Sequence, residues 1–298
     1  MRQLHVQKTV TQIRNTKYIM LSFKSVAISL CFFTSIVWAN KNLSDNHIKF
    51  YTLDCGTFDV ADISVLSKTG EYDGQQLKMV NPCFLIRHPK GDLLWDTGHI
   101  DSMADKTDGE LNGVWHAKLK TKLLGQLRQL EIAPNDVEYL SLSHLHPDHA
   151  GNANEFVEST FIVNELEHKY MFSEQIKSIF GAYYADLENA KTITFKNEYD
   201  VFGDDTVVIK SMPGHTPGSS VLLVRLNKSG NILLSGDLYL HAQGRKLGTM
   251  FQYNIDKQLT LDSRKKFEAL AKKESATVII QHEKQHFARL PKFPKFLD

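Results

Sequence analysis

Three histidines and one aspartate fall within six consecutive residues of the segment 143–149, which reads Ser-His-Leu-His-Pro-Asp-His. Imidazole nitrogens and a carboxylate oxygen are ligands that suit Zn²⁺ and similar metals. Side chains of an extended segment alternate in direction, so His144 and His146 can face one metal ion. Asp148 and His149 follow a proline that bends the chain, and they can serve a second ion. A polar loop with solvated histidines is the weaker alternative, because the rest of the chain supplies further ligands.

Three more metal-capable residues each follow a short apolar run. His215, Asp237 and His282 come after the runs 207–209, 232–234 and 278–280. Short β-branched runs closed by turn residues indicate buried strands. The three residues would therefore leave strand tips, where catalytic loops commonly lie. Each residue alone would more often be structural, but their joint occurrence after the segment 143–149 indicates a metal site.

This order of ligands resembles that of the metallo-β-lactamase superfamily over about residues 48–298. The turn Asp96-Thr97-Gly98 also resembles an early Asp-Thr-Gly turn of that superfamily. Within the superfamily, the chain is similar to the N-acyl homoserine lactonase branch at three segments, namely 72–74, 83–89 and 235–239. The resemblance implies an α+β fold, the four-layer αββα sandwich, and it is more specific for fold and metal than for substrate.

The resemblance also implies a dinuclear site that holds two Zn²⁺ ions, although other divalent metals could occupy it. It assigns the first ion to His144, His146 and His215, the second to Asp148, His149 and His282, and a bridging position to Asp237. Metal ions lower the pKa of a bound water to about 7, so a hydroxide would be available at neutral pH. The implied reaction is attack of that metal-bridging hydroxide on a lactone carbonyl, with Asp148 carrying a proton to the leaving oxygen.

Three other residues are candidates for further roles at the site. Asp96 is expected to accept a hydrogen bond from a ligand histidine and so to fix its orientation, the alternative being a cap on its own turn. Similar lactonases have a tyrosine three residues after the bridging aspartate, where this chain has Leu240. Tyr239 is the candidate catalytic donor to the substrate carbonyl, its alternative being packing. His241 is a second candidate in the same loop.

Apolar periodicity predicts the elements that position these residues. In the first half, strands are expected over 47–53, 61–66, 81–88, 92–96, 137–142 and 161–163. In the second half, they are expected over 192–195, 206–211, 219–226, 231–234 and 276–281. Helices are predicted over 116–130, 165–172, 173–184 and 257–273. Strands followed by helices in both halves fit the αββα sandwich.

Aromatic residues outside the metal motifs could line a substrate pocket. Trp115, with Val114, ends a polar loop at 99–114 and could form a flap over the site, although packing under the next helix is slightly favoured. The region around 180–184 walls the acyl-chain pocket in similar lactonases, so Phe180, Tyr183 and Tyr184 are candidates. The alternative is that these three rings belong to the core.

The first 39 residues have the pattern of a secretory signal. A basic segment at 20–24 precedes an apolar run over 26–37, and cleavage is expected after Ala39. Met20 would be the natural start. The run is shorter than the roughly 20 residues of a membrane-spanning helix, so an uncleaved anchor is the weaker alternative. A single domain over 40–298, periplasmic or secreted and without a stable membrane anchor, is therefore expected.

The composition of the chain restricts the classes of partner that it could bind. Of the 298 residues, 42% are hydrophobic and 23% are charged, which is typical of a globular protein, and the net charge of +1 does not suggest a nucleic-acid surface. Cys55 and Cys83 could form a disulfide in an exported protein or remain buried free thiols, and the sequence does not decide between them.

The sequence therefore predicts a metal-dependent hydrolase that opens acyl homoserine lactones, a quorum-quenching activity, with the acyl lactone as its small-molecule partner. Another hydrolase on the same site, a β-lactamase or a thioesterase, is the alternative. A non-catalytic binding protein of the same fold is a third reading, which the complete ligand set disfavours. The resemblance is also compatible with a homodimer.

Overall fold

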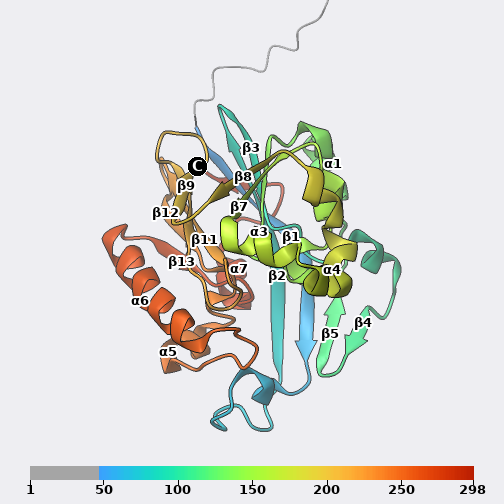
Figure 1. Ribbon diagram of the computed structural model, residues 1–298, viewed down its shortest axis with the longest axis vertical. Coiled ribbons are helices and arrows are strands. Elements are labelled where there is room, and N and C mark those ends of the chain that lie inside the picture. Colours follow the sequence, from blue (N-terminus) through green and yellow to red (C-terminus); the bar gives the residue numbers. More distant parts are fainter. Residues whose placement is uncertain (1–46) are drawn as a thin grey trace, which may run out of the picture. The chain divides into compact units, whose positions relative to one another are not determined.

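The computed structural model describes residues 47–298, which form one unit (Figure 1). The signal segment expected over residues 1–39, with its cleavage site and the start at Met20, lies outside the described residues. Within 47–298, no helix is both long and apolar enough to cross a membrane.

Two β-sheets form the centre of this unit. The first has nine strands, eight of them in one path: β4 (Glu110–Asn112), β5 (Trp115–Lys118), β1 (Lys49–Val60), β2 (Leu77–His88), β3 (Gly91–Trp95), β6 (Tyr139–Ser141), β7 (Thr160–Asn164) and β8 (Thr192–Phe195). The ninth, β14 (Phe296–Leu297), pairs with β1. The second sheet has five strands in the order β13 (Thr277–Ile279), β12 (Gly230–Leu234), β11 (Ser220–Leu226), β10 (Val207–Ser211) and β9 (Glu198–Asp200).

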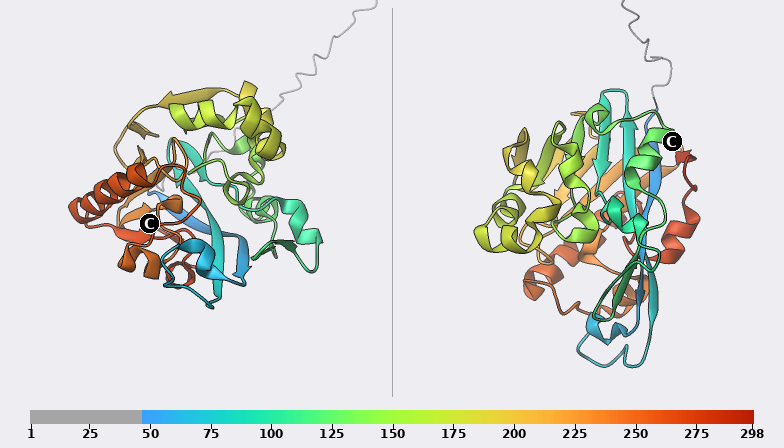
Figure 2. Two further views of the ribbon diagram at one scale, coloured as in Figure 1. Left: turned by 60° about the horizontal axis from the view of Figure 1, so that its bottom comes forward. Right: turned by 90° about the vertical axis from the view of Figure 1, so that its right-hand side faces the viewer.

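Helices cover the outer face of each sheet, as Figures 1 and 2 show. Near the first sheet lie α1 (Leu123–Gln129), α2 (Pro147–Ala150), α3 (Glu165–Met171) and α4 (Glu174–Phe180). Near the second sheet lie α5 (Ala242–Leu247) and α6 (Lys257–Lys273), whereas α7 (Lys284–Arg289) contacts β2 of the first sheet. The longest of them, α6, begins where the side chain of Asp256 accepts a hydrogen bond from the Leu259 amide at 2.8 Å.

The side-chain alternation of β11 explains why the layers stack in this way. Leu222 and Val224 point into the core between the two sheets, whereas Val221 and Leu223 point into a second core with Phe267 of α6. Successive strand residues face opposite sides, so a continuous apolar run indicates a strand that is covered on both faces. The predicted α+β fold and its αββα sandwich are confirmed.

Two predicted elements were wrong. Residues 61–66 do not form a strand, because the chain turns there into the 3₁₀ helix η1 (Ile63–Leu66). The helix predicted over 116–130 is divided into the strand β5 and the helix α1. Ala117 pairs with Phe58 of β1, so backbone pairing to a distant strand overrides the helical spacing of the leucines.

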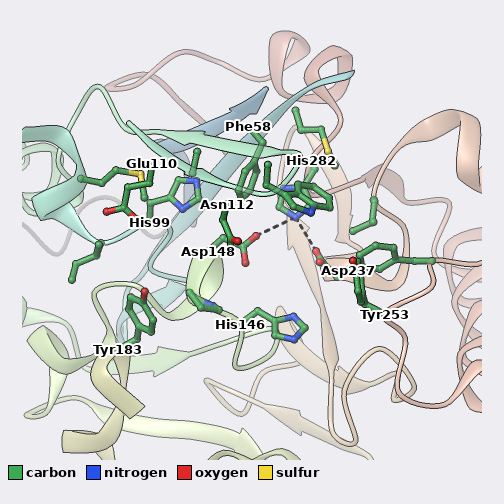
Figure 3. A pocket seen from close by; sticks show the side chains of 18 of the residues that line it. Phe58, His99, Glu110, Asn112, His146, Asp148, Tyr183, Asp237, Tyr253 and His282 are labelled. Atoms are coloured by element: carbon green, nitrogen blue, oxygen red, sulfur yellow. Dashed lines mark hydrogen bonds and ion pairs between the residues drawn. The ribbon is translucent and has the colours of Figure 1, made fainter. Parts of the chain in front are cut away.

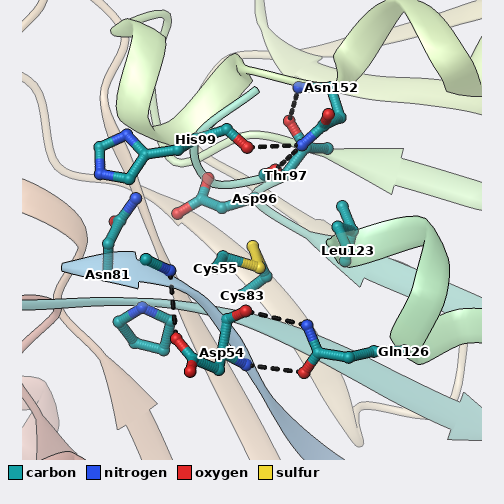
Figure 4. Close-up of a disulfide and its surroundings, with 12 residues drawn as sticks. Asp54, Cys55, Asn81, Cys83, Asp96, Thr97, His99, Leu123, Gln126 and Asn152 are labelled. Atoms are coloured by element: carbon teal, nitrogen blue, oxygen red, sulfur yellow. Dashed lines mark hydrogen bonds between the residues drawn. A yellow bond between two sulfur atoms is a disulfide. The ribbon is translucent and has the colours of Figure 1, made fainter. Parts of the chain in front are cut away.

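A disulfide joins Cys55 of β1 to Cys83 of β2, which answers the question that the sequence left open (Figure 4). It lies where the β1–β2 register shifts between Asp54 and Thr57. The side chain of Gln126 in α1 holds this irregular point, since it bonds both the backbone N–H and the carbonyl of Asp54 at 2.9 and 2.8 Å. Gln126 therefore satisfies both polar groups of the Asp54 backbone at this irregularity.

Candidate metal centre

The seven residues proposed as metal ligands come together at one edge of the two sheets. The segment 144–149 follows β6 of the first sheet. In the second sheet, β10, β12 and β13 run in the same direction, so the residues that follow them leave the same edge. His215, Asp237 and His282 are those residues. The structure therefore brings together every residue that the sequence analysis proposed as a ligand.

The first cluster consists of His144, His146 and His215. His146 Nδ1 lies 2.8 Å from His144 Nε2 and 3.1 Å from His215 Nε2, and the two Nε2 atoms are 3.2 Å apart. Burial lowers the pKa of His144 and of His215, so both rings are neutral and each offers a nitrogen lone pair. Three converging ring nitrogens suit a Zn²⁺ ion or a similar cation.

The second cluster consists of Asp148, His149 and His282, of which Asp148 and His282 are labelled in Figure 3. Asp148 Oδ2 lies 3.3 Å from His149 Nε2 and 3.7 Å from His282 Nε2. His149 is fully buried, and its Nε2 atom makes no hydrogen bond within residues 47–298. A buried ring nitrogen without a hydrogen bond, facing a carboxylate, fits a cation at this position.

Asp237 lies between the two clusters and faces both. Its Oδ1 atom is 3.0 Å from His282 Nε2 and 3.3 Å from His149 Nε2. Its Oδ2 atom is 3.5 Å from His215 Nε2 and 3.9 Å from His144 Nε2. One oxygen is thus directed to each cluster, which is the geometry that a carboxylate shared by two ions requires.

Hydrogen bonds at the outer ring nitrogens orient these histidines. His149 Nδ1 lies 3.0 Å from Asp96 Oδ2, His215 Nδ1 lies 2.9 Å from Asn254 Oδ1, and His282 Nδ1 lies 2.9 Å from the Val80 carbonyl. Acceptors at Nδ1 place the proton there and leave the Nε2 lone pair for a metal. The hydrogen bond expected between Asp96 and a histidine of the site is therefore present. The sequence analysis missed Asn254 and the Val80 carbonyl, because neither belongs to a motif.

The carboxylates around His149 make this ring attractive to positive charge. Burial alone would lower the pKa of His149, but Asp148, Asp237 and Asp96 together raise it well above its ordinary value. A cation bound to the second cluster would replace that proton, since metal binding to histidine releases protons. The electrostatics of the cluster thus favour a bound cation.

A cavity of about 420 Å³ opens in front of both clusters. Apolar side chains make up much of its wall, among them Phe58, Met79, Trp115, Leu240 and Phe251. Trp115 also packs edge-on against Phe58, with ring centroids 5.6 Å apart. Trp115 therefore lines the cavity from the strand β5, and its packing partner is β1 where the sequence analysis had favoured the following helix.

The three aromatic candidates of the region 180–184 have different positions. Tyr183 lines the cavity, on the side opposite Phe58 in Figure 3. Phe180 packs edge-on against the ring of His146, with centroids 5.9 Å apart. Tyr184 is fully buried in the core and donates its hydroxyl to the Met171 carbonyl, so it does not wall the cavity.

Comparison with known proteins identifies the family. Residues 79–282 match the sequence pattern of the metallo-β-lactamase superfamily. The chain belongs to this superfamily. All seven residues of the two clusters fall within the matched range, and the range ends at His282, the last of them.

The curated relatives of this superfamily member include lactonases. It is 30% identical over 263 residues to the N-acyl homoserine lactonase AttM of Rhizobium radiobacter, with 84% of this chain and 98% of that protein covered. It is 26% identical over 233 residues to the N-acyl homoserine lactonase AiiA of Bacillus thuringiensis subsp. kurstaki, with 75% and 89% covered.

Solved structures support the same fold for this superfamily member. An N-acyl homoserine lactone hydrolase with N-hexanoyl-L-homoserine bound at its catalytic metal centre aligns with a TM-score of 0.72, at 23% identity, over 85% of this chain and 100% of that chain. AidC, a dizinc quorum-quenching lactonase, aligns with a TM-score of 0.60, at 17% identity, over 84% of this chain and 89% of that chain.

Tyr239 does not have the position that the sequence analysis gave it. Its hydroxyl donates to Glu268 Oε1 at 2.9 Å, and the Arg264 guanidinium lies over its ring at 4.7 Å. Leu240, one residue later, lines the cavity instead. The expectation of a catalytic Tyr239 is thus corrected to a packing role. His241 is not among the residues that line the cavity, and its Nδ1 atom caps α5 by accepting from the Gly244 amide at 3.1 Å.

This correction predicts that Tyr239→Phe keeps most of the activity of this superfamily member. Loss of a donor to a developing oxyanion costs about 10²–10³-fold in kcat, whereas loss of the Glu268 contact should lower kcat by less than about tenfold. The free energy of unfolding should fall by about 1 kcal/mol, the net value of one hydrogen bond. Steady-state kinetics and thermal unfolding of the purified variant check both values, and a loss of kcat near 100-fold would restore Tyr239 to the mechanism.

Proposed function

We propose that this protein is a dinuclear metal-dependent hydrolase that opens the lactone ring of N-acyl homoserine lactones. The observation that carries the proposal is Asp237, whose two oxygens face two clusters of nitrogen and oxygen ligands. The relatives named as N-acyl homoserine lactonases support the substrate class. The activity would be quorum quenching.

The ligand set suits two Zn²⁺ ions, because imidazole and carboxylate are the groups that zinc prefers. His144, His146 and His215 would hold the first ion, Asp148, His149 and His282 the second, and Asp237 both. Two such ions supply a nucleophilic water of lowered pKa and polarise a carbonyl oxygen. AidC, described as dizinc, supports zinc over other divalent metals.

Asp148 is the residue best placed to move a proton. Its side chain is 20% exposed and lines the cavity, whereas the side chain of Asp237 is only 7% exposed. A carboxylate at the cavity surface can accept a proton from an attacking water and return it to the leaving oxygen. Asn81 holds Asp148 in this place by donating its side-chain amide to the Asp148 carbonyl at 2.7 Å.

The wall of the cavity supports a substrate with an apolar chain. Phe58, Met79 and Trp115 come from three elements of the first sheet or its edge and face the cavity together. Their contact with an acyl chain would remove apolar surface from water, which contributes roughly 25 cal/mol per Å². A lactone with an acyl tail can thus place its ring at the metal clusters and its tail against this wall.

A substrate series tests the proposal. The full chain, loaded with zinc, is assayed for acid release from N-acyl homoserine lactones of increasing chain length, and for hydrolysis of nitrocefin and a glutathione thioester. We expect turnover of the lactones, loss of that turnover after removal of metal by a chelator, and its return with zinc. Zinc-loaded protein that opens no lactone of any length would overturn the proposal, and preferential hydrolysis of nitrocefin or the thioester would reassign the site.

We also propose that the protein is exported and that its signal is removed after Ala39, which would leave it periplasmic or secreted. The disulfide between Cys55 and Cys83 supports an oxidising compartment, because such bonds persist there and are rare in the cytosol. The mass of the protein isolated from the producing cells tests this: a mature form that still contains residues 1–39 would contradict it.

A further inference from the structure

Glu167, near the start of α3, is a buried carboxylate that the proposed reaction does not use. It is 1% exposed, and its partners within residues 47–298 are hydrogen-bond donors, with no basic side chain among them. Burial of a charged group without compensation is costly, so such a group needs strong hydrogen bonds. Its partners are therefore informative about its role.

All the donors to this carboxylate come from the two loops that carry the first cluster. Glu167 Oε1 accepts from the Leu145 amide at 3.0 Å. Glu167 Oε2 accepts from the Thr216 hydroxyl at 2.7 Å and from the Gly218 amide at 2.9 Å. Leu145 lies between His144 and His146, and Thr216 directly follows His215. One side chain thus joins the two loops on which all three histidines depend.

The fold sets the position of Glu167 independently of any metal. Asn164 begins α3 by accepting a hydrogen bond from the Leu166 amide at 2.9 Å. Gly218 allows the loop to lie directly on this helix start, because a Cβ atom there would be 2.3 Å from the Glu167 nitrogen. The carboxylate is therefore presented to the loops by a rigid element.

The second cluster is anchored by other residues. The Thr97 amide donates to the His149 carbonyl at 2.6 Å, and Asn81 donates to the Asp148 carbonyl. Asp96 orients the His149 ring. Loss of the Glu167 carboxylate should therefore disturb one cluster and spare the other.

We propose that Glu167 is a positioning residue that sets the metal affinity of the first cluster, and of that cluster alone. The inference rests on the dinuclear site of the proposed function. A carboxylate is required because all three partners are donors, and a glutamine amide would turn its own NH₂ group toward at least one of them. Loss of an outer partner of a metal site typically lowers metal affinity about 10–100-fold.

Stepwise metal binding tests the proposal without reference to turnover. Metal-free full-length protein is titrated with Co²⁺ while its visible absorption is followed, and zinc affinities are measured by competition with a chelator. The variant is Glu167→Gln, the matched control is Glu165→Gln on the exposed side of the same helix, and a His215→Ala protein assigns the signal of the first cluster. We expect Glu167→Gln to bind its first-cluster ion about 10–100-fold more weakly, with an altered cobalt spectrum and an unchanged second affinity.

Other outcomes would overturn the proposal or its basis. Equal weakening of both affinities would mean that Glu167 acts through general stability, and unchanged affinities would mean that it does not act on the metal site. If Glu167→Gln does not fold, Thr216→Val removes one donor and keeps the carboxylate, and it should weaken the same ion in the same direction. Wild-type protein that binds fewer than two ions would instead remove the dinuclear site of the proposed function.

Discussion

Replacing Asp237 by asparagine should lower kcat/KM for a lactone by more than about 100-fold while the protein still folds. Loss of a mere outer partner of a metal site costs about 10–100-fold, and Asp237 faces both clusters directly. Its Oδ1 atom lies 3.0 Å from His282 Nε2 in the second cluster, and its Oδ2 atom lies 3.5 Å from His215 Nε2 in the first cluster. An amide has one oxygen, so its NH₂ group must face one of the clusters and repel a cation there.

The measurement combines kinetics with metal analysis of the same preparation. Asp237→Asn should contain less than two metal ions per chain, or should bind the second one far more weakly than wild type. Asp262→Asn is the matched control, because Asp262 lies on the outer side of α6 and its side chain bonds Lys265 and Gln258 of the same helix. An Asp237→Asn protein with two tightly bound ions and nearly normal kcat/KM would contradict the bridging role.

The seven ligands could be predicted because their identity depends on short segments that end strands. His215, Asp237 and His282 each follow an apolar run, and such runs indicate strands that are buried on both faces. Once these strands share a sheet and a direction, their ends must meet at one edge. The sequence therefore contains the main part of the candidate site, although no single residue of the three would have been convincing alone.

The direction of Tyr239 could not be predicted, because it depends on a side chain far away in the sequence. The chain after Asp237 makes a short 3₁₀ turn, η7 (Gly236–Leu238), before it becomes extended. Arg264 of α6 donates to the Leu238 carbonyl at 3.1 Å and covers the ring of Tyr239. Alternation then turns Leu240 toward the cavity. Counting residues from the bridging aspartate could not anticipate the attraction of Arg264 and Glu268.

The residues that orient the ligands could also not be predicted from the sequence. Asn254 precedes α6, Val80 contributes only a backbone carbonyl, and Glu167 lies in a predicted helix that was given no role at the site. Their roles arise from tertiary contacts between segments that are separated by 22 to 202 positions in the chain. Residues of this kind have no local pattern, whereas metal ligands do.

The disulfide gives the second large expected effect. Replacing both Cys55 and Cys83 by alanine should lower the free energy of unfolding by about 3 kcal/mol, because the bond closes a loop between cysteines 28 positions apart and so restricts the unfolded chain. Guanidinium unfolding with and without a reductant checks this. Reductant should destabilise the wild type and leave the double variant unchanged, and a wild type that is indifferent to reductant would contradict the prediction.

Removal of the disulfide should also weaken metal binding at the second cluster, because the disulfide supports the turn that carries Asp96. Gly98 of that turn lies so close that a Cβ atom there would be 2.2 Å from Cys55 Cβ and 3.0 Å from Cys83 Sγ. Asp96, two residues earlier, holds the His149 ring at 3.0 Å. We therefore expect the double variant to lose the ion at His149 and His282 before the ion at His144 and His215 when a chelator is added. The opposite order would mean that the disulfide stabilises the strands without supporting the site.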